Sequence, residues 1–182
     1  MSVAEQRTGT DLLLLTRLQR GENDAWTTVA QDYSPRLFAY LRQNLPSSED
    51  AEDVLSETLS AAVRAVGNFD GRAALSTFLY AIAYRKIADF WRKHTHVSSL
   101  DSDTQTIDVT APGPTAQERI EFEDAMATLP EISRQVLLLR YQVGLGVDEI
   151  AEILDRSYKG TESLLSRARS QLREVMQESP IA

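Results

Sequence analysis

The sequence lacks cysteine, a long apolar run and an apolar N-terminal segment, and these absences bear on the compartment of the protein. None of its 182 residues is cysteine, which excludes disulfide bonds and cysteine-based zinc sites and fits a reducing compartment. No apolar run approaches the roughly eighteen residues that a membrane-spanning helix needs. The polar start, Met1 to Asp11, has no apolar core of the kind found in a signal peptide. We therefore expect a cytoplasmic protein that does not engage the membrane.

Signs of catalysis are also missing. The sequence has no Gly-rich phosphate loop and no recognisable pairing of a nucleophile with a base. Its two histidines, His94 and His96, lie beside a polar stretch, where side chains are usually solvated. We predict no catalytic residue, no metal and no cofactor. An enzyme that binds a metal through these histidines and the clustered carboxylates is the weakest of three hypotheses.

Net positive charge is absent as well. With 19 bases and 27 acids the chain carries a formal charge of -8, which argues against nucleic-acid binding by the whole surface. An acidic total still allows a basic patch on a single segment, so the charge of each segment is considered separately.

No strand alternation appears, and apolar residues recur at helical spacing along most of the chain. This predicts an all-α fold of two helical domains, residues 11–93 and 115–177. Residues 94–114 are rich in Ser, Thr, Asp and Pro and predict a mobile linker. A disordered start, residues 1–10, and a tail, residues 178–182, complete the predicted organisation.

The end of the chain fits a helix-turn-helix. Ile150, Ala151 and Leu154 form one apolar stripe, and a polar break over residues 155–159 follows. Thr161, Leu165, Ala168 and Leu172 form a second stripe, which leaves the outer face of this helix free for a DNA groove. Bases enrich that outer face: Lys159, Arg167, Arg169 and Arg173, against the single acid Glu162. An ordinary helical hairpin with a solvated basic face is the alternative interpretation.

Two segments of the first half are also charged unevenly. Five acids and no base begin one helix, namely Glu49, Asp50, Glu52, Asp53 and Glu57. Helix capping and partner binding explain them about equally well. Residues 69–93 hold five bases, two acids and six aromatic residues, a mixture that suits single-stranded nucleic acid. Most of those rings also fit a core position, and Phe69, at a turn, is the better candidate for base stacking.

Taken together, these features resemble bacterial RNA polymerase sigma factors of the extracytoplasmic-function (ECF) group. The resemblance covers about residues 11–174 and rests on four stretches in order. These are DLLLLTRLQRGENDAW, AEDVLSETL, FDGRAALSTFLYAIAYRKIADFWRK and the closing helix-turn-helix. It implies a promoter-melting domain, a linker and a domain that reads the minus-thirty-five element. Core RNA polymerase and promoter DNA, both duplex and single-stranded, are the implied partners, with room for an anti-sigma factor.

The resemblance also implies roles for individual residues. Asp50, Asp53 and Glu57 would dock on core polymerase. The loop around Asn68, Phe69, Asp70 and Arg72 would capture a base flipped out of the minus-ten element. Contacts at the upstream edge of that element would come from Arg85, Lys86, Arg92 and Lys93. The recognition helix would present Lys159, Glu162, Ser163, Ser166, Arg167 and Arg169 to the minus-thirty-five element.

The chain departs from the family pattern at Ala81, Arg85, Glu162 and Leu164, where the family often has Arg, Asn, Lys and Arg. These departures affect the expected promoter sequence more than the class of activity. A second hypothesis is a stand-alone helix-turn-helix regulator that binds duplex operators. The basic and aromatic segment favours the sigma factor, because a duplex reader has no use for base-stacking residues.

Overall fold

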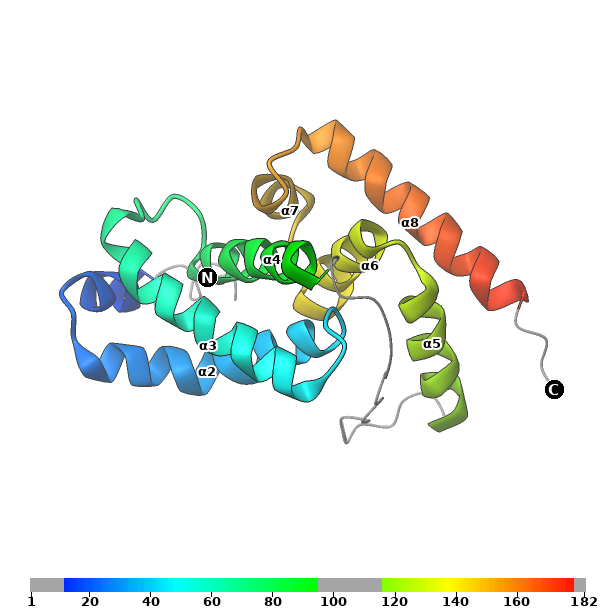
Figure 1. The fold of residues 1–182 in the computed structure, drawn as a ribbon. Coiled ribbons are helices and arrows are strands. Elements are labelled where there is room, and N and C mark those ends of the chain that lie inside the picture. The colour runs from blue at the N-terminus through cyan, green and yellow to red at the C-terminus, as the bar shows by residue number, and fades with distance from the viewer. Residues whose placement is uncertain (1–11, 95–115, 179–182) are drawn as a thin grey trace. The chain divides into compact units, whose positions relative to one another are not determined.

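The computed structural model describes residues 12–94 and 116–178, and within these ranges it contains helices and no strand. The chain divides into two compact units, residues 1–102 and 103–182, and each is described by itself. The predicted all-α fold with two helical domains is confirmed (Figure 1). The predicted linker lies outside the described residues, except for His94. His94 is instead the last residue of a helix, where its ring stacks on Phe90 with centroids 3.9 Å apart.

The first unit is built around three long helices. A helix over residues 12–19 comes first, followed by α2 (Asn23–Arg42), α3 (Ser48–Ala65), the short η1 (Val66–Asn68) and α4 (Leu75–His94). Helix α3 packs against both α2 and α4. Fully buried side chains on the facing stripes form the core: Leu18, Val29, Leu37, Tyr40, Leu41, Ala62, Leu79, Ala83 and Ile87. Burying these apolar faces stabilises helices whose outer faces are polar.

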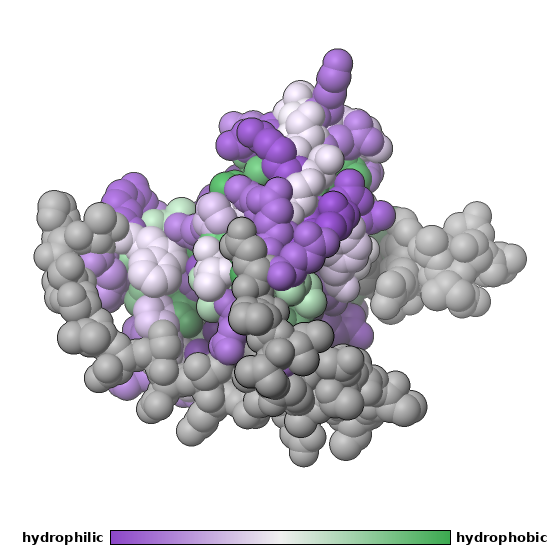
Figure 2. Space-filling view, turned by 90° about the vertical axis from the view of Figure 1, so that its right-hand side faces the viewer, coloured by the Kyte–Doolittle hydropathy of each residue, from purple (hydrophilic) through white to green (hydrophobic). Residues whose placement is uncertain are grey.

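The second unit contains the predicted helix-turn-helix. Its elements are α5 (Ala116–Thr128), α6 (Glu131–Leu137), the π-helical turn η2 (Leu138–Val143), α7 (Val147–Ile153) and α8 (Tyr158–Glu178). Gly144, at φ 85°, ends η2 in the left-handed conformation that glycine adopts without strain. Helix α8 packs against α5, α6 and α7. On the face drawn in Figure 2, hydrophilic side chains predominate among the described residues, and hydrophobic ones show as small patches.

The turn between α7 and α8 is shorter than the sequence predicted. Helix α8 begins at Tyr158, whereas the polar break was expected to last through Lys159. The reason is a cap: the Ser157 hydroxyl accepts a hydrogen bond from the Gly160 backbone N–H at 3.1 Å. A serine at this position satisfies one of the free N–H groups of the first turn, so the helix starts two residues earlier.

Candidate nucleic-acid interface

The three acids predicted to share one docking role have three different environments on α3. Asp50 belongs to the helix start: its backbone N–H donates to the Ser47 hydroxyl at 3.0 Å, and that hydroxyl donates to the Asp50 carboxylate at 2.6 Å. Asp53 is exposed. Glu57 pairs with Lys86 of α4. The capping interpretation therefore accounts for Asp50, and Asp53 is the carboxylate most open to a partner.

The Glu57–Lys86 ion pair lies between two surfaces for which the sequence predicted different partners. The Lys86 ammonium lies 2.9 Å from the Glu57 carboxylate. The hydrogen bond from Lys86, with the nearby charges of Lys86 and Lys93, lowers the pKa of Glu57 against a smaller opposing effect of burial. Glu57, predicted to meet polymerase, thus lies beside two bases predicted to meet DNA.

The loop after η1 is organised by short-range contacts. The Phe69 ring is half-buried and stacks on Phe78 of α4, with centroids 4.5 Å apart and planes inclined by 24°. The Asp70 carboxylate accepts from the Arg72 backbone N–H at 3.0 Å and pairs with its guanidinium at 3.1 Å. Asn68 and Arg72 are exposed. Phe69 therefore offers only one face to an incoming base, because the other covers Phe78.

The N-terminal helix holds this loop, which the sequence did not predict. The Gln19 side-chain amide donates to the backbone carbonyl of Phe69 at 2.7 Å and of Val66 at 3.3 Å. No local pattern marks Gln19, because its partners lie about fifty residues further along the chain. Its role becomes visible only in the folded protein.

The end of α4 combines bases with an aromatic cluster. Arg85, Arg92 and Lys93 are exposed, and Arg92 pairs with Asp89 one turn earlier. The Trp91 indole N–H donates to the Asn44 carbonyl at 3.1 Å, and its ring meets Phe90 edge-on. These rings are half-buried, as expected for residues that partly serve the core.

The outer face of α8 carries every residue assigned to it from the sequence. All six predicted DNA contacts of this helix are exposed: Lys159, Glu162, Ser163, Ser166, Arg167 and Arg169. Thr161, Leu165 and Ala168 form the buried stripe on the opposite face, whereas Leu172, predicted as its fourth member, is only half-buried. Leu164 is also buried, so it widens the core contact. Arg169 leans to one flank, where it lies 3.5 Å from the Tyr141 hydroxyl.

Within residues 12–94 and 116–178, no group of three His, Asp or Glu side chains is placed to hold a metal ion. No helix in those ranges is long and apolar enough to cross a bilayer.

Known proteins resemble both halves of the chain. The family described as Sigma-70 region 2 matches residues 29–97, and that described as Sigma-70, region 4 matches residues 119–172. The ECF RNA polymerase sigma-E factor of Haemophilus influenzae is 29% identical, over 96% of this chain and 98% of its own. The RNA polymerase sigma factor NccH of Alcaligenes xylosoxydans xylosoxydans is 27% identical, over 94% and 97%.

Solved structures share the fold. CnrH, in complex with the cytosolic domain of CnrY, has a TM-score of 0.73 at 22% identity and covers 93% of this chain and 99% of that one. The sigma factor RpoE of Bartonella quintana, in complex with the anti-sigma factor NepR, has a TM-score of 0.67 at 20% identity. That match covers 85% of this chain and 98% of the other.

Proposed function

This chain belongs to the sigma-70 family, in its extracytoplasmic-function group, and we propose that its two units divide promoter recognition between them. It binds core RNA polymerase, directs it to specific promoters and helps to melt the minus-ten element. The observation that carries this function is the succession of region 2 and region 4 matches in one chain. Members of this family are transcription initiation factors and in general not enzymes.

The proposed roles follow the environments of the side chains. Asp53, exposed on α3, is the main docking carboxylate for core polymerase, while Asp50 supports the helix start and Glu57 holds Lys86. Asn68, Phe69, Asp70 and Arg72 form the loop that captures the flipped base. Arg85, Lys86, Arg92 and Lys93 meet the upstream edge of the minus-ten element. The six exposed residues of α8 read the minus-thirty-five element.

The stand-alone regulator is not favoured, because region 2 accounts for the acidic helix, the loop and α4 together. A transcription assay separates the two. We expect weak binding of the free chain to duplex DNA, since its charge is -8, and promoter-specific transcripts once core polymerase is added. A randomised promoter library supplies the template. Tight, specific duplex binding without core would instead support the regulator.

The melting role is tested at Phe69. A flipped base must regain in its pocket the few kcal/mol lost on unstacking. Phe69→Ala removes the ring that would stack on the base and leaves Phe78 uncovered. We expect a roughly tenfold slower open complex on duplex promoters, with a smaller loss on pre-melted bubble templates. Equal losses on both templates would show that Phe69 serves packing alone.

Location and further partners follow from this function. Because bacterial RNA polymerase works in the cytoplasm, we propose that location for the chain. An anti-sigma factor is a further proposed partner, since the RpoE that shares this fold was solved with one.

A further inference from the structure

The N-terminal helix, residues 12–19, touches the loop of residues 66–72 at two separate points. At one, Gln19 donates to the carbonyls of Phe69 and Val66. At the other, Gly71 has φ +71° and lies so close to the helix that a β-carbon there would stand 2.8 Å from the Leu15 methyl. The helix precedes residues 29–97, the part of the chain that matches region 2.

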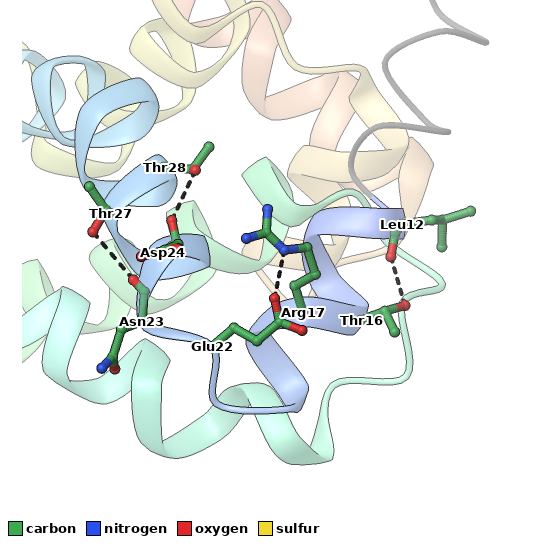
Figure 3. Close-up of polar contacts among 8 residues, drawn as sticks. All are labelled: Leu12, Thr16, Arg17, Glu22, Asn23, Asp24, Thr27 and Thr28. Atoms are coloured by element: carbon green, nitrogen blue, oxygen red, sulfur yellow. Dashed lines mark hydrogen bonds and ion pairs between the residues drawn. The ribbon is translucent and has the colours of Figure 1, made fainter.

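The helix is itself anchored, so it can act as a fixed support. Leu14, Leu15 and Leu18 are buried. Figure 3 shows Arg17 reaching Glu22, the residue before α2, with its Nε 2.7 Å from the carboxylate. The Glu22 backbone N–H also donates to the Arg17 carbonyl at 3.1 Å. Gln19 therefore extends from a helix that is tied to the body of the unit at both its apolar face and its end.

The chemistry of the amide explains why Gln19 suits this task. Its NH₂ group has two donors, and it offers them to two carbonyls three residues apart. The hydrogen bond to the Phe69 carbonyl orients the peptide group between Phe69 and Asp70. It therefore also sets the direction in which the backbone continues from Phe69 to Asp70. The Phe69 backbone N–H already donates to the Val66 carbonyl at 3.2 Å, so Gln19 closes a turn around Phe69.

We propose that Gln19 is a positioning residue for base capture: it holds the loop of residues 66–72 in the conformation that receives the flipped base. This rests on the proposed function of that loop. The N-terminal helix thereby becomes part of the melting apparatus. Without the amide, the loop must be ordered when the base arrives, and the cost of that ordering weakens capture.

The test uses holoenzyme and a single-stranded oligonucleotide of the non-template minus-ten sequence, with a second that is abasic at the flipped position. The quantity measured is the affinity for the intact oligonucleotide divided by the affinity for the abasic one. Gln19→Met keeps the approximate length of the side chain but removes both N–H donors. Gln19→Glu replaces the donors with a carboxylate that faces the two carbonyls. We expect Gln19→Met to lower the ratio roughly three- to tenfold, and Gln19→Glu at least as much. The control Gln31→Met alters an exposed glutamine of α2 and should leave the ratio unchanged.

The ratio isolates positioning from folding, because both oligonucleotides bind the same population of holoenzyme. A Gln19→Met ratio equal to that of the wild type, while Phe69→Ala lowers it, would overturn the role of Gln19 alone. A wild-type ratio of one, or no effect of Phe69→Ala, would overturn base capture by this loop and the Gln19 role with it.

Discussion

The two units present their bases to solvent in different ways. In the first, Lys86 pairs with Glu57, Arg92 with Asp89 and Arg72 with Asp70. In the second, among the side chains that the structure describes at residues 121–177, no carboxylate forms an ion pair with a base of α8. An acid beside a base competes with phosphate for the same cation, so these three bases must exchange partners to bind phosphate. The second unit offers its bases directly.

This difference suits a division of labour. We propose that the region 2 unit meets DNA only within the holoenzyme, where phosphate displaces the partners of these exposed ion pairs. The region 4 unit presents a surface that needs no such exchange.

The first prediction separates the acids of α3. Reversing Asp53 and Glu57 together to lysine should lower affinity for core polymerase roughly 100-fold at low salt, through like-charge repulsion. Asp53→Lys alone should cause most of this loss, because Glu57 is already engaged by Lys86. Fluorescence anisotropy with labelled protein measures the affinity, and Asp32→Lys, an exposed acid of α2, is the control. Unchanged affinity in the double variant would refute the docking assignment.

The second prediction concerns alkaline pH. Burial raises the pKa of Tyr80 from 10.0 to about 12, against a smaller lowering by Arg36. A raised folded-state pKa stabilises the fold below the unfolded pKa, and this stability is lost as pH rises from about 10 to about 12. The loss is about 2–3 kcal/mol. The second unit should resist better, because its two tyrosines, Tyr141 and Tyr158, are exposed.

Urea unfolding at pH 9 and pH 11, monitored by amide hydrogen exchange, distinguishes the stabilities of the two units. The first unit should lose protection before the second. In Tyr80→Phe this part of the pH dependence should disappear. An equal alkaline slope in the wild type and Tyr80→Phe would contradict the assignment.

The third prediction addresses Glu162, the acid that lies among the predicted DNA contacts of α8. A carboxylate near DNA repels phosphate and can accept from a cytosine amino group. Glu162→Lys should therefore raise affinity roughly three- to fivefold across all upstream sequences and shift the preference at one base pair. Selection from a randomised promoter library with both proteins measures this. The same upstream motif with the same discrimination would make Glu162 a solvated charge only.

The fourth and smallest effect tests the ion pair of the first unit. Glu57→Gln frees Lys86 while adding no positive charge, and it should strengthen holoenzyme binding to single-stranded minus-ten DNA about twofold. The slope of log affinity against log salt concentration should steepen by up to about one, as expected for one additional phosphate contact. Glu52→Gln, an exposed acid on the same helix, is the matched control. If both variants behave alike, Glu57 does not restrain Lys86.

Local patterns in the sequence determined much of this protein. Apolar spacing alone separated Thr161, Leu165 and Ala168 from the exposed face of α8, because a regular helix places residues three and four apart on one side. The same spacing located the long helices and the absence of strands among the described residues. Glu162 and Arg167 could be assigned to the open face for the same reason, since they fall between the members of the apolar stripe.

Tertiary structure decided which side chains act together. The Glu57–Lys86 pair, the Phe69–Phe78 stack and the reach of Gln19 to the loop all join different elements of the chain. Periodicity records which face of a helix is buried, but it carries no information on which neighbour covers that face. For this reason Glu57 acquired Lys86 as its partner only once the helices had packed, whereas the contact between Ser47 and Asp50 at the start of α3 is local.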